Sequence, residues 1–264
     1  MRVHHLNCGT MRPWGVPHGI VCHVLLVETA RGLVLVDSGL GLQDCESGGR
    51  RFGSARHLMR PALRESETAI RQVQNLGFSP GDVHHIVLTH FDADHAGGLA
   101  DFPTARVHVT RAEWQGVHHP ATLLEKTRYR PSQRLHRPEI VAHDVTGGDT
   151  WHGLRAAVEI TAVSEGIALV SLPGHTRGHA AVAVDTGSRL ILHTGDAFYH
   201  RAQTGGTGRV PAALRLLERT VAHDWPRVKA NHAWIQEVRA ARPDLLVVNS
   251  HDPDLLRRAR ATTP

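Results

Sequence analysis

The sequence contains very little cysteine. Only Cys8, Cys22 and Cys45 occur in 264 residues, and their spacing is irregular. A disulfide framework or a zinc ribbon needs more cysteines at regular spacing, so both are excluded. Packing in the protein interior is the expected role of these three thiols, in preference to catalysis.

Long hydrophobic runs are absent as well. The richest stretches, residues 24–27 and 33–36, are only a few residues long, whereas a membrane-spanning helix needs about 18 or more apolar residues. The first residues also show no apolar segment followed by a small-residue cleavage site, which argues against a secretory signal. Together with the few cysteines, these features predict a soluble protein of the reducing cytoplasm that makes no membrane contact.

Lysine is nearly missing, since Lys126 and Lys229 are the only two. The formal net charge of +5 therefore comes from arginines, and these are scattered along the chain instead of forming a basic block. A nucleic acid is not the expected partner. Hydrophobic residues make up 41% of the chain and charged residues 21%, which is typical of a globular protein. We expect residues 1–264 to form a single domain.

The order of apolar patterns predicts an α/β fold with mixed sheets. Residues 20–28 and 33–37 are typical of a hairpin of buried strands, and further strands and helices follow in an irregular order. The expected strands are 85–89, 106–110, 167–172, 180–185, 189–194 and 245–249, and the expected helices are 66–76, 111–117, 211–217 and 228–241. No GxGxxG follows a strand and no GxxxxGK[ST] occurs, so dinucleotide and P-loop sites are excluded.

Two segments have weak periodicity. Residues 41–65 are rich in glycine and arginine, and residues 118–138 are polar and basic. We interpret each as a lid or insertion. The second segment could alternatively form an oligomer contact, so a homodimer remains open.

Histidine is abundant, with 22 in the chain, and an isolated histidine therefore carries little information. One constellation stands out, because residues 89–98 place four ligand-type side chains within six positions just after an expected strand. These are His90, Asp92, Asp94 and His95. Loops held by a rigid sheet can direct such side chains to one point, and imidazole and carboxylate are ligands that divalent metals prefer.

Three later residues share this placement at the end of an apolar run. His175 lies in the segment 173–179 (PGHTRGH), Asp196 in 194–196 (TGD), and His251 in 249–252 (NSHD). The sequence thus predicts that one metal site is assembled from several strand ends.

These motifs resemble the metallo-β-lactamase-fold hydrolases, whose pattern is HxHxDH, a GHTxGH-type histidine, a GD aspartate and a late histidine. The resemblance extends from Asp37 to His251 and implies a four-layer αβ/βα sandwich of two mixed β-sheets flanked by helices. It also implies a binuclear centre, with Asp37 and His179 in hydrogen-bonding support. The implied ligands are His90, Asp92 and His175 for the first metal, Asp94, His95 and His251 for the second, and Asp196 as the bridge.

Asp92 departs from the family pattern, in which a second histidine is usual. With three aspartates, two divalent ions and one hydroxide, the formal charges of the centre sum to zero. A less positive centre is a weaker Lewis acid. We therefore expect two divalent ions per chain, with zinc as the leading assignment and iron or manganese favoured by the carboxylate at position 92.

Tyr199 follows Asp196 by three residues, as a tyrosine does in the quorum-quenching lactonases that share the implied fold. The resemblance implies that its hydroxyl stabilises the substrate carbonyl oxygen; packing in a pocket wall is the alternative. Residues 7–11 and Trp14 look similar to a loop that borders the site in that branch. Trp14, Phe91 and Phe198 could line an acyl pocket or belong to the core.

The expected activity is hydrolysis of a small ester or lactone by a metal-bridging hydroxide, with Asp94 and Tyr199 as catalytic residues and a small molecule as the partner. Phosphodiester or phosphonate hydrolysis is the first alternative. A β-lactamase is disfavoured because no export signal is visible, and a di-iron redox protein because no flavodoxin-like domain follows. A non-catalytic metal-binding protein remains a further alternative.

Overall fold

The first of two β-sheets is built from the N-terminal half of the chain. The computed structural model describes residues 1–145, 147 and 150–262, and the strands of this sheet lie side by side in chain order. The first three strands pair antiparallel and the last four pair in parallel, β3 being common to both sets. They are β1 (Arg2–Met11), β2 (Ile20–Thr29), β3 (Gly32–Val36), β4 (Val83–Val87), β5 (Arg106–Thr110) and β6 (Ile140–His143).

The second sheet has the order β11-β10-β9-β8-β7, and in it only β10 and β11 pair in parallel. Both sheets are therefore mixed, as the sequence predicts. The strands are β7 (Ala157–Glu159), β8 (Ile167–Ser171), β9 (Ala180–Asp185), β10 (Leu190–His193) and β11 (Leu246–Val248).

The two sheets pack face to face because both faces of their central strands are apolar. In β2, Leu25 and Val27 point into the core between the sheets, whereas Val24 and Leu26 point to the outer face of the first sheet. Successive side chains of a strand alternate between faces. The near-continuous apolar runs of β2 and β8 are thus explained by burial on both sides.

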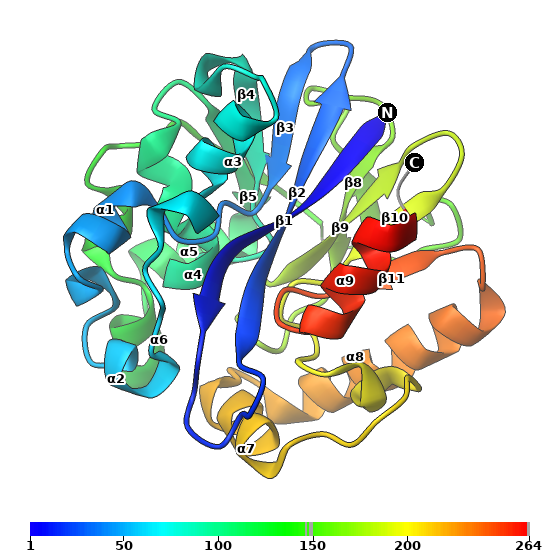
Figure 1. Cartoon of the computed structure of the whole chain (residues 1–264). Coiled ribbons are helices and arrows are strands. Elements are labelled where there is room, and N and C mark those ends of the chain that lie inside the picture. The colour runs from blue at the N-terminus through cyan, green and yellow to red at the C-terminus, as the bar shows by residue number, and fades with distance from the viewer. Residues whose placement is uncertain (146, 148–149, 263–264) are drawn as a thin grey trace.

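Helices cover the two outer faces, which completes four layers (Figure 1). Residues of α3 (Ala69–Asn75) and α5 (Arg111–His118) pack on the first sheet, and residues of α8 (Trp225–Ala241) pack on the second. None of the helices in the described part of the chain has the length and apolar character needed to cross a membrane. The remaining helices are α1 (Leu42–Glu46), α2 (Ala55–Met59), α4 (Ala93–Ala96), α6 (Leu123–Arg128), α7 (Ala212–Val221) and α9 (Pro253–Thr262).

Two local predictions were wrong. Residues 7–11, which we interpreted as a loop, belong to β1, where Thr10 and Met11 pair with Val21 and Ile20. The polar residues in this strand hide its apolar pattern, although His5 is buried and bonds to His23. The helix expected at 66–76 begins only at Ala69, because a 3-10 turn occupies Glu65–Glu67.

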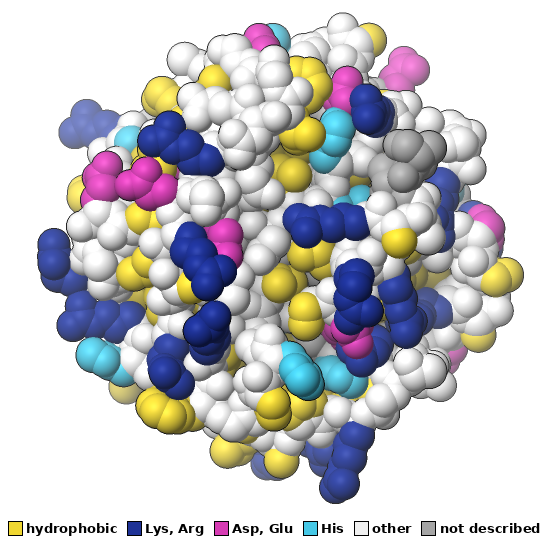
Figure 2. Space-filling view, viewed as in Figure 1, with side chains coloured by type: hydrophobic (Ala, Val, Ile, Leu, Met, Phe, Trp, Pro, Cys, Tyr) yellow, Lys and Arg dark blue, Asp and Glu magenta, His cyan; other side chains and the backbone are white. Residues whose placement is uncertain are grey.

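Arginines are spread over the face of the molecule that Figure 2 shows. Figure 2 shows Lys and Arg side chains spread over the face drawn, with acidic side chains between them. Several arginines are paired with exposed carboxylates, among them Arg106 with Glu139 and Arg111 with Asp144. On the face drawn, the positive charge therefore belongs to separate arginines with carboxylates between them.

A row of three histidines crosses β4, β5 and β6. His108 lies in the middle, with its ring nitrogens 2.9 Å from His85 Nδ1 and 3.0 Å from His143 Nε2. Burial lowers the pKa of His108 to about 3 from its ordinary 6.5, and His143, His85 and Arg106 act in the same direction. The folded chain therefore favours a neutral ring at this position.

This row predicts a loss of stability in mild acid. Between pH 6.5 and about 3 the unfolded chain binds a proton at His108 that the folded chain rejects, so the contribution of His108 is complete above pH 6.5 and falls as the pH drops. The expected slope is up to about 1.4 kcal/mol per pH unit. Urea unfolding from pH 7 to 4 should show a shallower decline for His108→Gln than for the wild type. The exposed control His57→Gln should keep the wild-type slope, and parallel slopes in all three proteins would contradict the assignment.

Candidate metal centre

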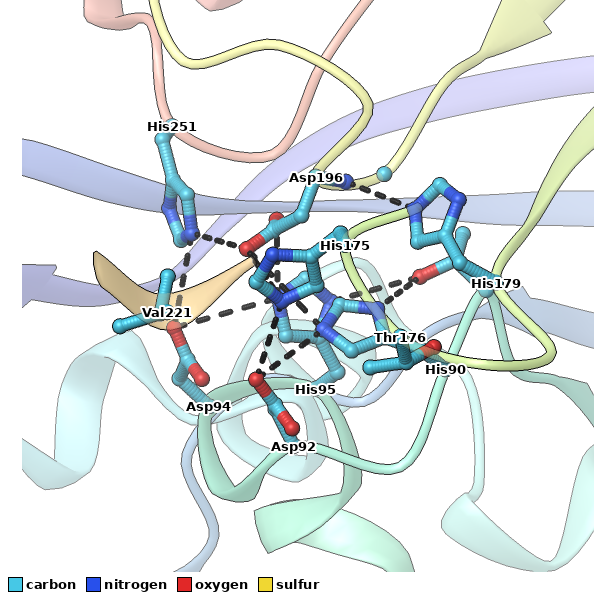
Figure 3. A network of polar contacts seen from close by, with 12 residues as sticks. His90, Asp92, Asp94, His95, His175, Thr176, His179, Asp196, Val221 and His251 are labelled. Carbon is cyan, nitrogen blue, oxygen red and sulfur yellow. Dashed lines mark hydrogen bonds and ion pairs between the residues drawn. The ribbon is translucent and has the colours of Figure 1, made fainter. Parts of the chain in front are cut away.

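Seven ligand-type side chains from four strand ends meet at one edge of the sheets (Figure 3). His90 and Asp92 follow β4, and Asp94 and His95 lie on the short helix α4 just beyond. The other three follow strands of the second sheet: His175 after β8, Asp196 after β10 and His251 after β11. The structure thus brings together every metal ligand that the sequence resemblance implied.

One group consists of His90, Asp92 and His175, whose ligand atoms all lie within 4.8 Å of one another. The Asp92 Oδ2 atom is 3.1 Å from His175 Nε2 and 3.5 Å from His90 Nε2. Because all three atoms face the same point, Asp92 can complete a group of three ligands.

A second group consists of Asp94, His95 and His251, with ligand atoms that also lie within 4.8 Å. Asp196 stands between the two groups. Its Oδ1 is 3.2 Å from His95 Nε2, and its Oδ2 is 3.1 Å from His251 Nε2 and 3.4 Å from His175 Nε2. A carboxylate that contacts members of both groups has the position required of a bridge.

The residues of this cluster fit divalent metal ions. His90 Nε2, His95 Nε2 and Asp196 Oδ1 are buried and have no hydrogen-bond partner among the described residues. Buried polar atoms without partners are costly, and convergent ones are explained by an ion that takes their lone pairs. The mixture of imidazole and carboxylate suits zinc, iron or manganese.

Hydrogen bonds behind the cluster fix the histidine rings. Asp37 Oδ2 accepts from His95 Nδ1 at 2.8 Å, and the Val21 carbonyl accepts from His251 Nδ1 at 2.8 Å. Both bonds leave the Nε2 atom free to face the cluster. Asp37 is itself held by the Thr89 backbone N–H at 2.8 Å.

His179 lies beside the cluster without joining it. Its Nδ1 donates to the Leu172 carbonyl, and its Nε2 accepts from the Asp196 backbone N–H, both at 3.0 Å. His179 therefore positions the loop that carries Asp196.

Sequence reasoning missed Glu113, a buried residue of α5. One carboxylate oxygen accepts from the Phe91 backbone N–H at 2.9 Å, and the other accepts from the Thr176 hydroxyl at 2.7 Å. Glu113 thus joins the loop of His90 to the loop of His175. In the sequence, Glu113 lies three residues after Thr110, the N-cap of α5. This spacing indicates the start of a helix and gives no sign of a role at the cluster.

Arg128 was missed as well, although it is nearly buried, with 6% of its side chain exposed. Its Nη1 donates to Asp92 Oδ2 and to His175 Nε2, both at 3.0 Å, and its Nη2 donates to the Val221 carbonyl. Arg177, the one arginine within the sequence motifs, instead turns to Glu125 at 2.7 Å. No sequence spacing links Arg128 to the motifs.

Charges in the cluster shift its acid–base equilibria. Burial by itself would raise the pKa of Asp92, but Arg128 and His90 hold the pKa well below its usual value. Burial and the charge of Arg128 lower the pKa of His175 to about 4. At neutral pH the first group therefore offers a carboxylate and a neutral imidazole, the forms that bind metal ions.

A pocket of about 390 Å³ opens above the cluster. Its floor includes Asp94, Asp196, His251 and Tyr199, and its walls are largely apolar. The apolar wall residues come from the segments around α2, α6 and α7: Phe52, Leu58, Met59, Leu124, Leu217 and Val221. Parts of both segments that we interpreted as lids, 41–65 and 118–138, thus face this pocket.

Tyr199 lies over the second group. Its ring centroid is 5.0 Å from that of His251 and 6.1 Å from that of His175. Burial, together with the charge of Asp196, raises the pKa of Tyr199 well above its usual value. The phenol therefore stays protonated and can donate a hydrogen bond into the pocket.

Three aromatic residues that we considered as pocket or border residues lie elsewhere. Phe91 and Phe198 are buried in the cores on the outer faces of the two sheets. Trp14 is 66% exposed, stacks under the Arg60 guanidinium and does not line the pocket. The apolar side chains that line the pocket come from helical segments. The apolar side chains of the strands are instead buried between the sheets and helices.

Curated relatives include metal-dependent hydrolases. The chain is 51% identical over 263 residues to the "Probable metallo-hydrolase Rv2300c" of Mycobacterium tuberculosis, covering 99% of this chain and 84% of that protein. A weaker similarity, 26% identity over 248 residues, links it to the N-acyl homoserine lactonase AttM of Azorhizobium caulinodans, with 91% and 85% coverage.

Solved structures share the fold. An AiiA lactonase variant of Bacillus thuringiensis with N-decanoyl-L-homoserine bound matches with a TM-score of 0.69, at 20% identity, over 97% of this chain and 95% of that one. The dizinc quorum-quenching lactonase AidC matches with a TM-score of 0.58, at 18% identity, over 89% and 74%.

The family itself follows from the extent of these matches. The model of the metallo-beta-lactamase superfamily matches residues 19–251, a range that includes all seven clustered ligand residues. The same range contains both sheets except β1. The chain therefore belongs to the metallo-β-lactamase superfamily and is a metal-dependent hydrolase.

Proposed function

We propose that this protein hydrolyses a small ester or lactone with the help of two divalent metal ions. One observation carries the proposal: two groups of three ligand-type side chains, contacted by Asp196, lie at the base of an apolar pocket beside a neutral tyrosine, and Asp92, Asp94, Asp196 and His251 belong to its lining. His90, Asp92 and His175 would hold the first ion, and Asp94, His95 and His251 the second. When bound, such ions polarise a carbonyl group and lower the pKa of water.

The chain's own residues would supply the remaining chemistry. Tyr199 can donate a hydrogen bond from its phenolic O–H to the carbonyl oxygen as negative charge develops there. Asp94 has 13% of its side chain exposed and lies on the pocket floor, so its carboxylate could take up the proton that the attacking water releases and pass it to the leaving alkoxide. The apolar wall is suited to an acyl chain. Relatives named N-acyl homoserine lactonases support this substrate class.

Phosphodiester hydrolysis is the second candidate, because Arg128 and Arg130 both line the pocket. A phosphodiesterase needs cationic donors around the non-bridging oxygens. The donors of Arg128 are directed to Asp92, His175 and Val221, which leaves few for a substrate. Arg130 then remains as the other arginine of the lining, and one cationic side chain is few for the several non-bridging oxygens of a phosphodiester. We therefore favour a neutral carbonyl substrate.

A substrate comparison tests this choice. Protein reconstituted with zinc should turn over lactones of several acyl lengths or aryl esters faster than bis(nitrophenyl) phosphate, with about two ions per chain by elemental analysis. The same preparation treated with a chelator is the control and should lose activity. Rapid cleavage of the phosphodiester with inert lactones and esters would promote the second candidate. If the protein contained no bound metal after metal-replete expression, the assignment of a two-metal centre would be wrong.

A further inference from the structure

Arg128 lies at the candidate metal centre, although it belongs to none of the sequence motifs that supply the candidate ligands. It is the last residue of α6, whose first turn is fixed by Thr122 and Glu125 in a capping box. The guanidinium extends from this helix to the cluster, and its Nη1 is 3.0 Å from both Asp92 Oδ2 and His175 Nε2. Two members of the first group therefore already have a cation as a partner.

This contact conflicts with metal ligation at His175. His175 Nε2 lies within hydrogen-bond distance of both Arg128 Nη1, at 3.0 Å, and Asp92 Oδ2, at 3.1 Å. With the ring proton on Nδ1, the form that a metal ion needs, the one lone pair of Nε2 either accepts from Arg128 or ligates the ion. Arg128 cannot resolve the conflict by losing a proton, since a guanidinium stays charged in proteins. A divalent ion in the first group must therefore take the lone pair of His175 from Arg128.

The second group carries no such competitor. Within the described part of the chain, His95 Nε2 and His251 Nε2 face only the carboxylates of Asp94 and Asp196 among charged side chains. Like charges repel strongly at short range in a buried site. The two groups thus differ in the charge that an incoming ion meets, although each offers three ligands.

We propose that Arg128 is a resident cation of the first group, which competes with a divalent ion for His175 and Asp92 and makes this group the weaker of the two metal sites. The inference rests on the two-metal centre of the proposed function. Arg128 also returns one positive charge to a centre in which Asp92 replaces the usual histidine. Asp92 and Arg128 therefore act as a pair, and the guanidinium can withdraw from His175 because it borders the open pocket.

Stepwise metal titration of the metal-free protein tests the first consequence. With zinc and a chromophoric competing chelator, the wild type should bind two ions with affinities that differ by more than about tenfold. Asp92→Asn should lose the weaker ion and keep the tighter one, because Asp92 belongs to the first group only. Equal affinities for both ions would overturn the proposal, and so would loss of the tighter ion in Asp92→Asn.

Removing the charge tests the second consequence. Arg128→Met should strengthen the weaker site by about tenfold or more and change the tighter site by less than about twofold. Arg128→Gln retains an amide donor for Val221 and should act in the same direction if the Met variant folds poorly. Arg130→Met is the matched control, since it removes an arginine of the same pocket that, within the described structure, forms no hydrogen bond or ion pair with the seven candidate ligands.

The outcomes separate this inference from the proposed function. Cobalt absorption spectra recorded during the titration should show that the weaker ion enters at lower concentration in Arg128→Met or Arg128→Gln. An unchanged or weaker second affinity in both variants, with two ions still bound by the wild type, overturns the role of Arg128 and leaves the two-metal centre intact. Strengthening by Arg130→Met to the same extent would indicate a general charge effect and also overturn it. If the wild type binds no second ion, the assignment of a two-metal centre is wrong, and the inference that rests on it is wrong as well.

Discussion

Asp196→Asn is expected to abolish hydrolysis and to lower the bound metal from about two ions per chain to one or none. The substitution preserves the shape of the side chain and removes the charge that faces His95, His175 and His251 at 3.1 to 3.4 Å. Loss of an outer hydrogen-bond partner of a metal ligand costs about 10–100-fold. Loss of the charge of the proposed bridging carboxylate should lower kcat/KM by more than about 100-fold.

Metal analysis and thermal unfolding complete this test. Asp196 is buried, and its backbone N–H is held by His179, so the Asn variant should keep the fold while it loses metal. Asp144→Asn, which removes an exposed carboxylate paired with Arg111, is the control and should retain activity and metal. An Asn variant that keeps two ions and substantial turnover would show that Asp196 is no bridge.

Tyr199→Phe is expected to lower kcat by about tenfold to a hundredfold while KM changes little. Loss of an oxyanion donor costs about 10²–10³ at a fully formed site, and less where metal ions share the charge. The ring that packs on His251 remains in the variant, so the pocket keeps its shape. The measurement is the separate determination of kcat and KM on the best lactone or ester.

The chain offers a matched control for this variant, because it contains only two tyrosines. Tyr129 lies in the core on the outer face of the first sheet and does not line the pocket. Tyr129→Phe should therefore leave kcat near the wild-type value. If Tyr199→Phe behaves like Tyr129→Phe, or raises KM alone, Tyr199 is a wall residue and not a donor.

Much of the fold was predictable because its signals are local. The near-continuous apolar run of β2 and the following turn predict the hairpin with β3, which the structure confirms. The strand β1 was missed because His4, His5 and Asn7 interrupt its apolar pattern. Burial of a histidine such as His5 depends on a partner, His23, that lies on the next strand.

The convergence of the seven candidate ligands at one place was predictable for a similar reason. Each lies just beyond a strand, and parallel strands such as β3 and β4, or β10 and β11, end at the same edge of a sheet. The sequence could not decide between pocket and core for Phe91 and Phe198. That choice depends on which face of each loop meets a helix.

By itself, the sequence determined the strand periodicity, the ligand types at the strand ends and the aspartate at position 92. Only the tertiary structure decided what surrounds that aspartate. Arg128 is 36 residues away from Asp92 in the chain and 47 from His175, and α6 carries it to both. Residue spacing encodes contacts within an element or across a tight turn. The packing of α6 over the sheet edge depends on many weak contacts at once, and no local pattern records them.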